Sequence, residues 1–159
     1  MNVADILAPE DVVLDLRAPD KRRLIEELAR RAAALAGIEP APLAEALLLR
    51  EGLGSTGMGS GIAIPHARLP SVARPRGLFA RLRPGIDFDA IDGERVDLVF
   101  LLLLPAQAQV QAQIQAQGDQ MNALACVARR LRAEGVKAAL RRAHVAEQLF
   151  AALARDGEG

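Results

Sequence analysis

The chain has 159 residues, and its 20 lysine and arginine residues are balanced by 20 aspartate and glutamate residues. This length suits one domain with a sizeable core, and the even balance without basic runs gives no indication of nucleic-acid binding. A single cysteine excludes an internal disulfide framework, and the longest apolar run (99–104) is too short to span a bilayer. The first residues also lack the basic region of a secretory signal. We therefore expect a soluble cytoplasmic protein that is not embedded in a membrane.

The first elements predicted along the chain are a strand and two helices. Residues 12–16 form an apolar run that is typical of a strand. Asp20 is a suitable N-cap for a helix whose apolar residues recur at helical spacing as far as a stop signal at Gly37. A second helix is predicted from near Pro42 to about Glu51.

Three strands are predicted in the middle of the chain. A glycine-rich loop leads into a short strand at 62–64, and another strand covers 77–82 before a turn at Pro84 and Gly85. Residues 96–104 are nearly all apolar, as expected of a central strand that is covered on both faces.

Three helices are predicted after these strands, at 119–132, 136–142 and 145–154. Strands that alternate with helices, without a shift in composition, predict a single α/β layered domain over residues 1–159.

Residues 106–118 interrupt this pattern with a low-complexity repeat in which glutamine alternates with alanine, valine or isoleucine. The alternation would extend the preceding strand, whereas alanine and glutamine are also good helix formers that would start the next helix early. Of these alternatives and a flexible loop, we favour the loop.

The segment from Gly54 to His66 carries the strongest functional indication. A neutral imidazole is a good nucleophile that titrates near physiological pH, and glycines let backbone N–H groups approach an anion closely. Together they indicate that His66 takes up a phosphoryl group. On glycine spacing alone, we would favour a plain helix-to-strand turn.

Other kinds of site find little support. The loop lacks the Gly-Lys-Ser/Thr of a nucleotide-binding P-loop, and a helix precedes it where a dinucleotide motif needs a strand. Two distant histidines, His66 and His144, and one cysteine do not make a metal site. We expect Cys126 to be buried on a core-facing helix and His144 to lie on the surface.

Residues 49–66 resemble the phosphorylation-site signature of enzyme IIA proteins of the bacterial phosphoenolpyruvate-dependent sugar phosphotransferase system. The similarity is greatest to the nitrogen-regulatory branch of the fructose/mannitol superfamily, and residues 86–100 and 122–131 resemble that branch too. The resemblance implies the enzyme IIA mannitol/fructose-type fold, a mixed sheet flanked by helices.

The resemblance also implies roles for particular residues. His66 would be the phosphoryl acceptor, through Nε2, with a histidine-containing phosphocarrier protein as donor. Arg50 matches an arginine that would offset the phosphoryl charge, and its alternative is a helix-end ion pair with an acid such as Glu51. Further matches form the loop around the phosphoryl group: Ser55, Thr56, Gly57, Gly59 and Gly61.

Gln120 departs from the family pattern. The family usually places a second histidine at the position that corresponds to Gln120, at the start of the helix after the central strand. A glutamine can donate an amide N–H to a phosphate but never carries charge. The phosphoryl site would then be weakly supported or impaired.

These observations leave three functional hypotheses. The first is a regulatory phosphoryl carrier that accepts phosphate on His66, needs no metal or nucleotide, and signals through downstream partners that the sequence does not name. The second is a binding module that is no longer phosphorylated, with Gln120 as its motivation. The third is a sugar-specific enzyme IIA for a separately encoded transporter. A chain without an attached transporter domain favours regulation.

Overall fold

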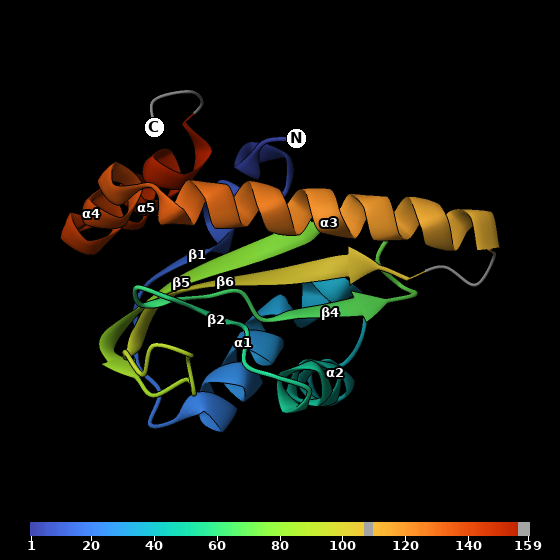
Figure 1. The fold of residues 1–159 in the computed structure, drawn as a ribbon, viewed down its shortest axis with the longest axis horizontal. Helices are drawn as coiled ribbons and strands as arrows, with labels where there is room; N and C mark the ends of the chain where they lie inside the picture. Colours follow the sequence, from blue (N-terminus) through green and yellow to red (C-terminus); the bar gives the residue numbers. More distant parts are fainter. Residues whose placement is uncertain (107–109, 156–159) are drawn as a thin grey trace.

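The structure is a computed structural model that describes residues 1–106 and 110–155. Within these ranges it describes every side chain except those of residues 110–117, 119 and 120. A six-stranded mixed sheet forms the middle layer (Figure 1). Its strands are β1 Val12–Leu16, β2 Gly57–Gly59, β3 Ile62–Ala63, β4 His66–Leu69, β5 Arg76–Ile86 and β6 Val96–Pro105. Helices α1 Lys21–Ala36 and α2 Pro40–Gly52 cover one face, and α3 Val110–Arg132, α4 Glu134–Arg142 and α5 Ala146–Ala154 cover the other. The mixed sheet flanked by helices is the predicted fold class.

Strand β6 lies at the centre of the sheet. It pairs antiparallel with β5 and parallel with both β3 and β4, while β1 pairs parallel with β5 and β2 antiparallel with β3. Its side chains alternate between the two cores, with Leu101 and Leu103 towards α1 and α2, and Phe100 and Leu102 towards α3 to α5. This explains why the strand is apolar at nearly every position, because both of its faces are covered.

The first predicted helix is confirmed at both ends. The Asp20 carboxylate accepts a hydrogen bond of 2.8 Å from the backbone N–H of Arg23, which caps the first turn of α1. Gly37 ends the helix in a left-handed conformation with φ 69°.

One prediction in the sheet is wrong, and the short strands β2 and β4 were not predicted from the sequence. The strand predicted at 77–82 does not end at a turn: β5 continues through Pro84 and Gly85 to Ile86, and a register shift between Arg81 and Ile86 absorbs the irregularity. Residues 62–69 run beside β6 as two short strands, since Pro65 has no N–H to donate to the ladder while its carbonyl accepts from Leu102 at 2.9 Å.

The loop predicted over residues 106–118 is also wrong for most of that segment. Helix α3 begins at Val110, nine residues before the predicted start at Asp119. The helix-forming preference of alanine and glutamine therefore prevails over the strand-like alternation. Residues 107–109 lie outside the described part of the chain.

Candidate functional site

His66 lies where the backbone passes from β3 to β4, and its ring is held from two sides. Nδ1 lies 3.0 Å from the carbonyl oxygen of Ile64. A carbonyl oxygen only accepts, so Nδ1 carries the proton and donates to it. In the neutral ring this leaves Nε2 with a lone pair.

Arg50, on the last turn of α2, meets that lone pair. Its Nε–H donates to His66 Nε2 at 3.3 Å, and its Nη1 donates to the carbonyl of Gly54 at 2.9 Å. The alternative ion pair with Glu51 is not what the structure shows: the Glu51 carboxylate pairs instead with the ammonium of Lys21 at 2.8 Å. The structure thus brings Arg50 and His66 together.

The surroundings favour the neutral form of His66. The residue is only 8% exposed. Burial, chiefly, and the Arg50 guanidinium lower the pKa of His66 below its ordinary value, while the Ile64 carbonyl and the Glu51 carboxylate act in the opposite direction. A neutral ring with a lone pair on Nε2 is the nucleophilic form of histidine.

The glycine loop, residues 54–61, is fixed mostly by protein groups. Ser55 Oγ donates to the carbonyl of Phe88 at 2.8 Å, and Thr56 Oγ1 donates to the Glu51 carboxylate. The backbone N–H groups of Thr56, Gly57 and Ser60 donate to Glu51, to Ser55 Oγ and to Asp92 respectively. In this structure these hydroxyl and amide hydrogens are therefore bonded to groups of the protein itself and do not point to where a phosphoryl group would bind.

Three of the four glycines in the loop serve different needs. Gly59 and Gly61 have φ of 89° and 81°, which L side chains rarely adopt. A Cβ on Gly61 would also lie 2.5 Å from the Arg141 guanidinium, and a Cβ on Gly57 would lie 2.9 Å from that of Ala90. The loop thus packs tightly at Gly57 and at Gly61.

His66 and Arg50 line two hollows. One, of about 250 Å³, continues over the loop residues Ser55, Thr56 and Gly57 to Leu124 and Ala128 of α3. The other, of about 300 Å³, is mostly apolar and is bordered by Ala46, Leu49, Leu53 and Arg68. Leu49 and Leu53 are 73% and 84% exposed. A nucleophilic ring therefore opens onto a small cavity beside an exposed apolar surface.

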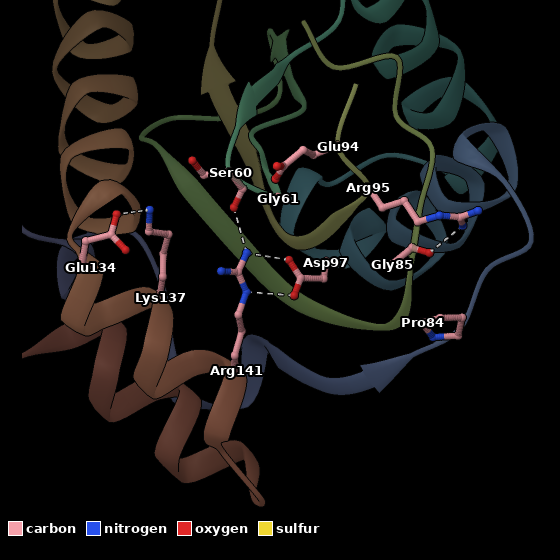
Figure 2. Close-up of a pocket in the computed structure, with 10 residues that line it drawn as sticks. All are labelled: Ser60, Gly61, Pro84, Gly85, Glu94, Arg95, Asp97, Glu134, Lys137 and Arg141. Atoms are coloured by element: carbon pink, nitrogen blue, oxygen red, sulfur yellow. Dashed lines mark hydrogen bonds and ion pairs between the residues drawn. The ribbon is translucent and has the colours of Figure 1, made fainter. Parts of the chain in front are cut away.

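A larger hollow, of about 660 Å³, lies elsewhere and shares no lining residue with these two (Figure 2). Its charged groups largely pair with one another: Arg141 forms a two-pronged contact with Asp97, and Lys137 pairs with Glu134 at 2.8 Å. Arg141 also donates to the carbonyl of Ser60 at 2.8 Å, which ties α4 to the glycine loop. Of the residues predicted to form the phosphoryl site, Gly61 lines this hollow, whereas His66 and Arg50 do not.

The remaining predicted residues have mixed outcomes. Gln120 falls within α3, but its side chain lies outside the described residues. Cys126 is half-buried rather than fully buried, its thiol donates to the carbonyl of Met1 at 3.3 Å, and desolvation raises its pKa. His144 is exposed, as expected. Within the described ranges, no group of three histidine, cysteine, aspartate or glutamate side chains is placed to hold a metal ion.

The ion pair behind the loop was not predicted from the sequence. Glu51 is 7% exposed, and the Lys21 ammonium that pairs with it lies 30 residues earlier, on α1. The same ammonium donates to the Phe88 carbonyl at 3.2 Å and sits 4.5 Å from the centre of the Phe88 ring. The only indication of the Glu51–Lys21 ion pair in the sequence was that Glu51 directly follows Arg50.

No single helix in the described ranges is long and apolar enough to cross a membrane. Helices α1 and α2 meet the length and composition requirement only as a pair, which is bent by 117°.

Comparison with known proteins gives consistent results. The family described as "Phosphoenolpyruvate-dependent sugar phosphotransferase system, EIIA 2" matches residues 5–156. The "Nitrogen regulatory protein" of Bradyrhizobium diazoefficiens is 42% identical over 154 residues, which cover 97% of this chain and 95% of that protein. The crystal structure of the nitrogen regulatory protein IIA-Ntr from Neisseria meningitidis matches with a TM-score of 0.84 and 34% identity over 95% of this chain and 98% of that one. The mannitol IIA of Escherichia coli, at 23% identity and a TM-score of 0.65 over 92% of this chain and 98% of that one, shares the fold.

Proposed function

Because the chain belongs to the EIIA 2 family of the phosphoenolpyruvate-dependent sugar phosphotransferase system, we propose that His66 accepts a phosphoryl group from a histidine-containing phosphocarrier protein. The observation that supports this best is the orientation of the ring. Nδ1–H is occupied by the Ile64 carbonyl, and the lone pair of Nε2 faces Arg50. The nucleophilic atom is thus defined before any partner binds.

The proposed step is an in-line transfer between two nitrogen atoms. The Nε2 lone pair attacks the phosphorus of the donor's phosphohistidine, the new N–P bond forms, and the old N–P bond breaks with its electron pair returning to the donor imidazole. Catalysis then consists of positioning and of charge stabilisation, as is usual for phosphoryl transfer. No metal or nucleotide takes part in the proposal.

Arg50 has a double role in this proposal. In the resting protein its Nε–H is bonded to Nε2, so this bond must give way as the phosphorus approaches. The guanidinium then lies beside the transferred group, where it offsets negative charge with charge-assisted hydrogen bonds. Leu49 and Leu53, which border the adjoining hollow, offer an apolar surface for the phosphocarrier.

We assign a regulatory purpose to the phosphorylated protein. The support is that the relatives that match most of the chain carry the name "Nitrogen regulatory protein". Phosphorylated His66 then changes which partner proteins bind, because it adds negative charge to the surface around the site. The proposal places the protein in the cytoplasm, in agreement with its single cysteine.

The test is incubation with phosphoenolpyruvate, the first enzyme of the system and its phosphocarrier protein, followed by intact-mass measurement. The wild-type chain should gain one phosphoryl group through an acid-labile, alkali-stable bond, and His66→Ala should gain none. Phosphate retained by the alanine variant would refute the assignment. A wild-type chain that gains none under full relay conditions would favour the binding module motivated by Gln120.

A further inference from the structure

The backbone that orients His66 is anchored by a buried ion pair that the proposed transfer does not itself use. Glu51 lies on the last turn of α2 and is 7% exposed. Negative charge is unfavourable near the C-terminal end of a helix, and burying a carboxylate is costly without partners. Glu51 therefore depends on its partners, the Lys21 ammonium at 2.8 Å and the backbone N–H and hydroxyl of Thr56.

A chain of hydrogen bonds leads from this pair to the ring. Glu51 holds Thr56, and the Thr56 carbonyl accepts from the backbone N–H of Ile64 at 3.1 Å. The Ile64 carbonyl in turn accepts from Nδ1–H of His66 at 3.0 Å. Each link fixes the position of the acceptor for the next, so the location of the Ile64 carbonyl depends on where Glu51 holds Thr56.

Lys21 ties the same chain to a second loop. Its ammonium bridges Glu51 and the carbonyl of Phe88, and Ser55 Oγ donates to that carbonyl as well. The start of α1, the end of α2, the glycine loop and the segment after β5 therefore meet at one buried point. Arg50, next to Glu51 on α2, contacts the opposite nitrogen of the ring.

From this geometry we infer that Glu51, neutralised by Lys21, is a positioning residue that sets the tautomer of His66 and so reserves Nε2 as the reacting atom. The inference rests on the proposed function for its consequence in phosphoryl transfer, but the tautomer itself is measurable without a donor. The Glu51 carboxylate also acts to raise the pKa of His66, which makes the ring a better base than burial alone would allow.

The decisive variant is Glu51→Gln, with Glu45→Gln as the matched control, because Glu45 is an exposed glutamate on the same helix. Nitrogen-labelled protein is observed by long-range proton–nitrogen correlation of the imidazole rings, and exposed His144 provides an internal reference. Wild type and Glu45→Gln should show His66 with the proton on Nδ1. Glu51→Gln should show a mixture of the two tautomers and a lower His66 pKa, with His144 unchanged.

Phosphorylation rates in the relay complete the test. We expect Glu51→Gln to be slowed by about tenfold or more, since a small misplacement of the reacting atom has effects of this size. Thr56→Val removes only the hydrogen bond from the Thr56 hydroxyl to Glu51, so it should change the tautomer populations of His66 in the same direction by a smaller amount. This variant serves as the test if Glu51→Gln does not fold.

The outcomes separate this inference from the proposed function. A wild-type tautomer in a folded Glu51→Gln or Thr56→Val variant would overturn the positioning role even if every protein is phosphorylated. A shifted tautomer in proteins of which none is phosphorylated would uphold the positioning role and refute the proposed function.

Discussion

At the scale of single residues, the reactivity of His66 follows from opposing contributions. Burial and Arg50 favour the neutral ring, and the Ile64 carbonyl and Glu51 favour the charged one, with a net lowering of the pKa. The sequence showed the histidine and the arginine through a local motif, within 16 residues of each other. It did not show Glu51 and Lys21 as a pair, because a contact across 30 residues depends on how α1 packs on α2.

The lowered pKa of His66 predicts how phosphorylation depends on pH. The ring should remain neutral and reactive as the pH falls past the ordinary histidine value of 6.5. The initial phosphorylation rate, measured under conditions where the donor is saturating, should therefore decline only below that value. A midpoint above 6.5 would contradict the burial argument.

The same shift has a consequence for stability. His66 takes up a proton at its ordinary pKa of 6.5 in the unfolded chain, but only at a lower pH in the folded protein. The contribution of the neutral ring to the free energy of unfolding is therefore complete above pH 6.5, and it is lost as the pH falls through the folded pKa. Removing the imidazole with His66→Ala should reduce the acid sensitivity of the unfolding free energy. The comparison variant is His144→Ala, which removes an exposed imidazole.

Arg50 is predicted to affect both the rate and the pKa. Arg50→Gln removes a charge-assisted hydrogen bond worth about 1.5–3 kcal/mol, so the rate should fall by roughly 10- to 100-fold. The pKa of His66 should rise, since the guanidinium lowers it. The phosphorylation rate of Arg50→Lys should lie between those of wild type and Arg50→Gln, because lysine retains the positive charge but lacks the planar guanidinium group. Arg22→Gln, on the exposed face of α1, is the control, and equal rates for all variants would rule out a role for Arg50.

At the scale of elements, local signals predicted the ends of α1 better than the ends of the strands. The cap at Asp20 and the stop at Gly37 mark α1 directly in the sequence. The end of β5 was misplaced, because Pro84 and Gly85 are local turn signals, whereas pairing of Ile86 with Val96 keeps the strand in the sheet. The short strand predicted at 62–64 corresponds to β3, but the four-residue β4 was not predicted because it depends on pairing with β6, which no local pattern reveals.

The early start of α3 leads to a stability prediction at Gly118. This glycine lies inside the helix, its φ is not in the left-handed range, and a Cβ there would meet no atom within 4 Å. Gly118→Ala should therefore stabilise the protein by about 0.5–1 kcal/mol and raise the melting temperature by a few degrees. Gly93→Ala, at φ 71°, should do the opposite. A lower melting temperature for Gly118→Ala would argue against a continuous helix from Val110.

At the scale of the whole molecule, Arg81 joins elements that are distant in the sequence. Its side chain is 2% exposed, although it lies on β5 in the middle of the sheet. It donates to the carbonyls of Leu140 and Ala143 at the end of α4, and to the Asp15 carboxylate on β1. The α/β class was predictable from alternating strands and helices, but this buried cation was not, since its partners lie about 60 residues away on both sides.

Arg81→Met should destabilise the fold strongly. The methionine fills part of the space but leaves the carbonyls of Leu140 and Ala143 without their donor, at about 1–3 kcal/mol for each buried group. Denaturant unfolding should show a loss of at least about 2 kcal/mol. Arg83→Met, two residues along the same strand with a side chain that is 59% exposed, is the control. A loss no larger than that of Arg83→Met would mean that water replaces the guanidinium.

The central claim is that Nε2 of His66 receives the phosphoryl group, and NMR of the phosphorylated, nitrogen-labelled protein tests it most directly. The account predicts one phosphorus signal, coupled to Nε2 of His66, while Nδ1 keeps its proton and its bond to the Ile64 carbonyl. A phosphorus coupled to Nδ1, or attached to any residue other than His66, would contradict the account.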